Sequence, residues 1–107
     1  MNEMEEEIAL NELALSSKLQ AYGPEDIDEF NVDKKVYLKK FEEVDEAQDE
    51  LVDKINWFLI EFPETERRDF YKDMYRKAIS EVREFKKPIK DKVMQVRRSM
   101  IPGNTAN

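Results

Sequence analysis

Carboxylates are the side chains of this 107-residue sequence whose type and spacing could do chemistry. Glu42 adjoins Glu43 and Asp49 adjoins Glu50, and two carboxylates can divide the roles of general acid and general base. Neighbouring residues on a helix point about 100° apart, however, so these pairs do not converge on one substrate. The sequence has no cysteine and no histidine, which excludes thiolate and imidazole catalysis and the usual zinc ligands. We therefore predict that the protein is not an enzyme, has no cofactor and takes no small-molecule substrate.

An acidic stretch, "PEDIDEFNVD" at residues 24–33, has the composition of a calcium loop but not its order. A calcium loop needs Asp or Asn ligands at fixed spacing, a glycine at its sharp turn and a final Glu. We predict no metal site here and interpret the acids as solvated and helix-capping. Ile27 and Phe30 are expected to pin this connection onto the fold.

Basic residues concentrate near the C-terminus of a chain whose net charge is -7. Residues 67–98 hold twelve Lys or Arg against five Asp or Glu, a local charge of +7. Our preferred interpretation is that this basic helix packs antiparallel to an acidic helix within the monomer. The alternative is a basic face for phosphates or an anionic membrane. Its candidate residues are Lys86, Lys87, Lys90, Lys92, Arg97 and Arg98. The surrounding acids would repel polyanions within a Debye length of about 8 Å, so we expect no nucleic acid partner.

Hydrophobic periodicity predicts the helices that must position these side chains. The first helix covers residues 2–22, and Leu10 and Leu13 are expected to widen its apolar stripe. It ends at Gly23, read as a left-handed cap, and Pro24, which cannot continue a helix.

The second helix carries an unbroken heptad seam at alternating steps of four and three residues. The seam consists of Tyr37, Phe41, Val44, Gln48, Leu51, Ile55, Phe58 and Phe62. Asp33 is the predicted N-cap, and Pro63 ends the helix. The short connection that follows predicts an antiparallel hairpin. The third helix starts near Glu64 and continues through a kink at Pro88 to Met100.

These elements predict an all-α fold, an antiparallel up-down-up three-helix bundle built on a long helical hairpin. A chain of this length supports one domain, which we place at residues 1–101, followed by a disordered tail at residues 102–107. No apolar run reaches the roughly 18 to 20 residues of a membrane span, and the N-terminus lacks the features of a signal peptide. We expect a soluble, cytoplasmic protein without an integral membrane segment.

The apolar run "INWFLIEF" at residues 55–62 is wider than one seam, because Trp57 and Ile60 lie outside the seam. Our preferred interpretation is that the first helix or the connection at residues 24–33 covers Trp57. The alternative is that Trp57 and Ile60 are exposed and bind a partner, since aromatic side chains are enriched at interface hot spots. Tyr71 and Tyr75 are expected to pack their rings against the core, with their hydroxyls at its rim.

Residues 41–93 resemble the second and third helices of the N-terminal three-helix domain of Vti-type Qb-SNARE proteins. The similar segments are the acidic "EAQDELVDKI", the turn "PETER" and the Tyr-rich and basic "FYKDMYRKAISEVREFKK". The chain lacks the SNARE heptad motif and the membrane anchor that follow in that family. The resemblance therefore implies a regulatory or adaptor-binding domain of a trafficking protein and not the fusion machinery.

Together these observations predict a non-enzymatic protein–protein interaction module whose partner is another protein or a second copy of the chain. In one form, a monomeric adaptor binds through Trp57 and Ile60. In the other, the chain self-associates as a structural protein, such as a helical segment of a viral, phage or retroelement assembly protein, with the acidic half of one copy against the basic half of another.

Overall fold

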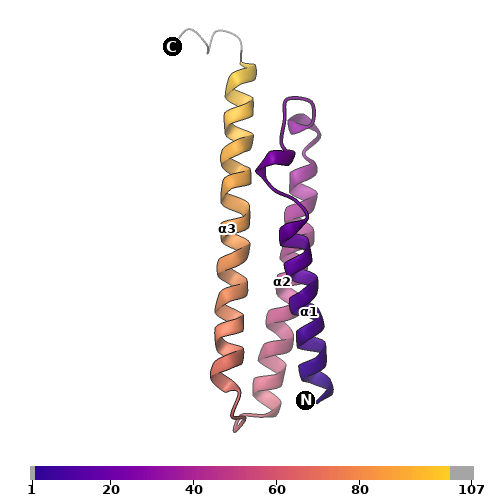
Figure 1. The fold of residues 1–107 in the computed structure, drawn as a ribbon, viewed down its shortest axis with the longest axis vertical. Helices are drawn as coiled ribbons and strands as arrows, with labels where there is room; N and C mark the ends of the chain where they lie inside the picture. The colour runs from indigo at the N-terminus through magenta and orange to yellow at the C-terminus, as the bar shows by residue number, and fades with distance from the viewer. Residues whose placement is uncertain (1, 102–107) are drawn as a thin grey trace.

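The computed structural model describes residues 2–101, which form three α-helices and two short 3₁₀ helices. The α-helices are α1 (Glu3–Gln20), α2 (Val36–Glu61) and α3 (Arg68–Met100). Between α1 and α2 lie η1 (Pro24–Asp26) and η2 (Val32–Lys34). Figure 1 shows α1 and α3 running in one direction and α2 in the other, so the predicted all-α up-down-up bundle is confirmed. The tail predicted at residues 102–107 lies outside the described residues.

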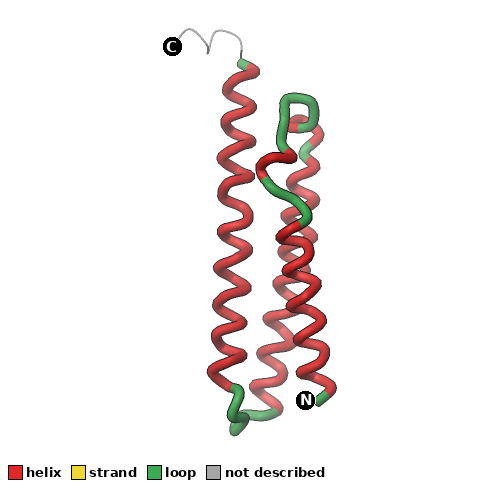
Figure 2. The backbone as a smooth tube through the Cα atoms, in the orientation of Figure 1, coloured by secondary structure: helices red, strands yellow, loops and turns green. Residues whose placement is uncertain are grey.

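The described part of the chain is a rod of 63 × 21 × 16 Å with buried side chains in two clusters along its length. The first cluster lies between α1, α2 and α3. The second lies beyond the end of α1, where the connection packs against α2 and α3 (Figure 2). Because α1 has 18 residues and α2 has 26, α1 is too short to cover the whole of α2. Phe85 packs against both clusters.

The connection is held by Ile27 and Val32, which are 2% and 0% exposed. The prediction for Ile27 is confirmed, but the prediction for Phe30 is wrong, because Phe30 is 79% exposed. The cause is a tight turn in which Asp28 Oδ1 accepts hydrogen bonds from the backbone N–H groups of Phe30 (2.9 Å) and Asn31 (3.0 Å). This turn directs Phe30 into solvent and returns the chain at Val32.

In α1, Asn2 is the N-cap, and its Oδ1 accepts a hydrogen bond from the N–H of Glu5 at 2.9 Å. Ile8 and Leu15 are the buried residues of this helix. Leu10 and Leu13 are exposed, so the prediction that they widen the stripe is wrong. Each lies two residues from a buried position, which is a rotation of about 200° to the opposite side of the helix.

The predicted boundaries between α1 and α2 are wrong in two places. Gly23 has φ −157°, which is extended and not left-handed, and α1 already ends at Gln20. Asp33 lies inside η2 and does not cap α2. Lys35 adopts the left-handed conformation, with φ 56°, immediately before α2 begins at Val36.

The seam predicted for α2 is buried over most of its length. Its buried members are Tyr37, Phe41, Val44, Leu51, Ile55 and Phe58. Gln48 is half-buried, and Ala47 beside it is buried. Phe62 follows the last residue of α2 and is 41% exposed.

The hairpin turn after α2 is longer than predicted, and α3 begins at Arg68 instead of near Glu64. The Thr65 N–H donates to the Phe62 carbonyl at 3.1 Å, and the Arg67 N–H donates to Thr65 Oγ1 at 3.2 Å. These two hydrogen bonds hold residues 62–67 in a turn, so the helix starts only after them. Pro88 lies inside α3, which has 33 residues, so the prediction that the helix continues past Pro88 is confirmed.

Candidate functional site

Trp57 is 61% exposed and Ile60 is 68% exposed, so the preferred prediction that α1 or the connection covers Trp57 is wrong. The connection packs against the opposite end of α2. α1 approaches α2 on another side, where Lys54 Nζ donates to Asn11 Oδ1 at 2.9 Å. Trp57 follows Lys54 by three residues and lies about 60° from it around α2, on the side that faces away from the buried seam.

Trp57 and Ile60 continue a row of carboxylates on the outer side of α2, which we call the acidic stripe. The acidic stripe consists of Glu42, Glu46, Asp49 and Asp53. With Trp57 and Ile60 these residues occupy an arc of about 80° on the side opposite the buried seam. All six side chains are exposed, and no carboxylate of the stripe forms an ion pair within residues 2–101.

On α3, a row of cations forms what we call the basic stripe. The basic stripe consists of Lys72, Arg76, Arg83, Lys87 and Lys90. They span an arc of about 60° around α3, and between residues 72 and 90 every residue in this arc is a Lys or Arg. Lys72, Arg83 and Lys90 form no ion pair with a carboxylate of the described residues. The other two form exposed pairs within α3, and such pairs contribute little stability.

The acidic and basic stripes lie on one face of the hairpin. At the shared edge Lys86 Nζ pairs with Asp45 Oδ1 at 2.6 Å. Phe41, four residues before Asp45, is buried, and Asp49, four residues after it, belongs to the acidic stripe. The same holds around Lys86, where Val82 is buried and Lys90 belongs to the basic stripe. On each helix, successive positions therefore pass from the buried side, past the Asp45–Lys86 ion pair, to the same outer face of the hairpin.

The six residues of the predicted basic face have different environments. Lys87 and Lys90 belong to the basic stripe. Lys86 and Arg97 contact α2. Lys86 Nζ pairs with Asp45 Oδ1, and Arg97 Nη2 donates to the Tyr37 hydroxyl at 3.1 Å. Arg98 lies within about 20° of Lys87, whereas Lys92 points about 200° away from Lys90. The sequence reasoning missed Lys72, Arg76 and Arg83 and the whole acidic stripe, although charges at heptad spacing behind the seam were visible in the sequence.

At the turn end of the rod, Tyr71 ties α3 to α1. Its hydroxyl donates to Glu5 Oε2 at 2.8 Å, and Arg67 Nη1 lies 3.4 Å from the same oxygen. The ring packs in the first cluster, as predicted. Burial, then the hydrogen bond to Glu5, then the charge of Glu5, raise the pKa of Tyr71 to about 12.

Tyr71→Phe should lower the free energy of unfolding by about 1 kcal/mol near neutral pH, because a hydrogen bond to a charged acceptor is lost. Folded Tyr71 keeps its proton up to about pH 12, whereas unfolded tyrosine loses it near 10.0. The stabilisation is therefore complete below pH 10 and lost as pH rises to about 12.

Urea unfolding at several pH values measures this effect. The difference in stability between the wild type and Tyr71→Phe should shrink as pH rises through that window. Tyr75→Phe is the matched control at neutral pH, because its hydroxyl donates to no carboxylate among the described residues. A difference that is constant up to pH 12 would contradict the assignment.

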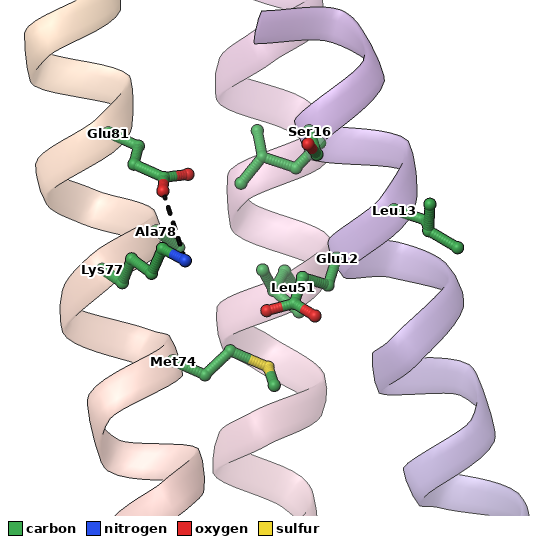
Figure 3. A pocket seen from close by; sticks show the side chains of 9 residues that line it. Glu12, Leu13, Ser16, Leu51, Met74, Lys77, Ala78 and Glu81 are labelled. Carbon is green, nitrogen blue, oxygen red and sulfur yellow. Dashed lines mark ion pairs between the residues drawn. The ribbon is translucent and has the colours of Figure 1, made fainter.

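A cavity of about 280 Å³ lies between α1 and α3 above a floor that includes Leu51. Figure 3 shows Met74, Lys77 and Glu81 projecting from α3 toward it, whereas Leu13 points away. Lys77 is the cation of the lining, and it pairs with Glu81 on the same helix at 3.7 Å. No cation of the lining is left to hold an anion, so we assign no ligand to this cavity.

The chain matches no protein-family model, no curated protein and no solved structure. Within residues 2–101, no helix has both the length and the apolar character that crossing a membrane requires. In the same residues, no group of three or more metal-binding side chains is placed to hold an ion.

Proposed function

We propose that this protein is a non-enzymatic protein–protein interaction module that binds its partner through the outer face of the α2–α3 hairpin. One observation carries the proposal: Trp57 and Ile60 are 61% and 68% exposed on a helix whose opposite side is buried over most of its length. An exposed Trp with an aliphatic neighbour one turn away is typical of a binding hot spot. Neither residue contributes to the two buried clusters, so the fold does not explain their apolar character.

The surroundings of Trp57 indicate the chemistry of the partner. The acidic stripe leads directly into Trp57 and Ile60, and its four carboxylates are not compensated within the described residues. A complementary surface therefore combines an apolar contact with several cations. The setting of vesicle trafficking rests on the resemblance of residues 41–93 alone and stays a prediction.

The double variant Trp57→Ala/Ile60→Ala should lose the partner while keeping its fold. Both side chains are exposed, so the free energy of unfolding should change by no more than about 0.5 kcal/mol. Loss of a hot-spot aromatic typically costs 2 kcal/mol or more of binding, about a thirtyfold decrease in affinity. The measurement is quantitative capture from an extract of the source cells by immobilised wild type and variant.

Leu10→Ala/Leu13→Ala is the matched control, because it removes two equally exposed side chains from α1. A protein captured by the wild type and by this control, but not by the Trp57 variant, supports the proposal. Identical capture profiles for all three chains would contradict it.

A further inference from the structure

We infer that the hairpin face binds a second copy of this chain in a symmetric, face-to-face dimer. This inference rests on the proposed function and names its partner. The surface complementary to the acidic stripe and Trp57 must offer cations along a helix, and the basic stripe of α3 has that character.

The two stripes make the face complementary to itself. They run side by side, acidic on α2 and basic on α3, and they meet at the pair of Asp45 and Lys86. A two-fold axis parallel to the rod, placed over this boundary, exchanges the two sides of the face. Each acidic stripe then lies against the basic stripe of the other copy, so both contacts form at once, as in an isologous interface.

The residues also match in height along the rod. Asp45 is level with Lys86, with which it pairs. Phe58 is level with Tyr71, because their ring centroids lie 4.9 Å apart. The acidic stripe is therefore level with about residues 77–89 of α3, which include Arg83 and Lys87. A two-fold axis along the rod preserves these levels.

Trp57 lies opposite cations in the same arrangement. By the same register it is level with about residue 73 of α3, between Lys72 and Arg76 of the basic stripe. An aromatic face attracts Lys and Arg side chains, most strongly when the ring is that of Trp. The dimer would cover the exposed Trp57 with the side chains that such a ring binds best.

The size of the face predicts a weak dimer. From Glu42 to Ile60, α2 rises about 27 Å. Over the 21 Å width of the rod this gives about 570 Å² per copy, about 1,100 Å² in total, near the lower limit for specific interfaces. We expect dissociation in the micromolar range or weaker. Because the charges are exposed, the dimer should weaken in 0.5 M salt, where the Debye length is only about 4 Å.

Complementary charge reversal tests this inference by sedimentation velocity over a range of protein concentrations. The first variant reverses the acidic stripe, Glu46→Lys/Asp49→Lys/Asp53→Lys. The second reverses the basic stripe, Arg83→Glu/Lys87→Glu/Lys90→Glu. Each variant alone should associate at least about tenfold more weakly than the wild type, because like charges then face each other. An equimolar mixture should form a heterodimer with wild-type affinity or better, because both stripe contacts are restored.

The matched control reverses three exposed acids outside the face, Glu7→Lys/Glu12→Lys/Glu84→Lys, and therefore has the same net charge as the first variant. It should dimerise like the wild type. Circular dichroism shows that each variant is folded before it is compared.

Three outcomes would overturn the inference. The first is a wild type that remains monomeric up to about 1 mM, where even a contact of millimolar affinity would be detected. The second is a dimer that survives reversal of either stripe. The third is an equimolar mixture of the control variant with the second variant that associates as strongly as the mixture of the first and second variants, since that would reflect net charge alone. A monomeric wild type would leave the capture of another protein through Trp57 standing, so the two proposals fail separately.

Discussion

Phe58→Ala should lower the free energy of unfolding by about 3–5 kcal/mol, the largest effect that we expect from one substitution. Phe58 is 2% exposed in the first cluster. Its ring centroid lies 4.9 Å from that of Tyr71 on α3 and 5.1 Å from that of Phe62. Alanine would leave a cavity where α2 meets α3 and the start of α1. Because small domains are stable by only about 5–15 kcal/mol, this one change could remove a large part of the total.

Urea unfolding followed by circular dichroism measures the effect of Phe58→Ala. Trp57→Ala is the control, because it removes a larger aromatic side chain from the adjacent position, where 61% of the residue is exposed. Its cost should stay within about 0.5 kcal/mol. Equal costs at the two positions would show that the side of α2 that faces the core has been assigned wrongly.

Pro88→Ala should raise the free energy of unfolding by about 2 kcal/mol. Pro88 lies in the interior of α3, where it lacks an N–H donor and its ring crowds the carbonyl of Glu84, at a cost of about 3 kcal/mol. Its side chain is exposed, so alanine loses little packing. Proline also restricts the unfolded chain, which offsets about 0.4–1 kcal/mol of the gain.

The same unfolding measurement tests this prediction, with Pro63→Ala as the control. Pro63 lies in the turn after α2, outside any helix, so its replacement relieves no helical strain. Unchanged or lower stability of Pro88→Ala would indicate that the helix around residue 88 already accommodates the ring without cost.

The fold could be predicted from the sequence where apolar residues recur regularly over a long segment that ends at a helix-breaking residue. The heptad seam of α2 extends over about four heptads, and Pro63 marks its end, so the hairpin followed directly. The segment between α1 and α2 was harder. Its course depends on the turn at Asp28 and on the left-handed Lys35, which are local hydrogen-bonding and backbone choices that periodicity does not encode.

The candidate site was only half predictable, for a related reason. Periodicity showed that Trp57 and Ile60 lie outside the seam, but not whether another element covers them. That depended on where α1 meets α2, which the polar contacts of Asn11 with Glu50 and Lys54 mark in the structure. The stripes do not show in the net charge along the chain, because their members align only around each helix.

The division of the interior at Phe85 has a consequence for how the molecule opens. The second cluster depends on Ile27 and Val32, which belong to a segment without a long helix of its own. Release of this segment would admit water to that end of the rod while the first cluster stays closed. Amide hydrogens near Ile89 and Val93 should therefore exchange through partial opening, and those near Leu51 and Ile55 only through global unfolding.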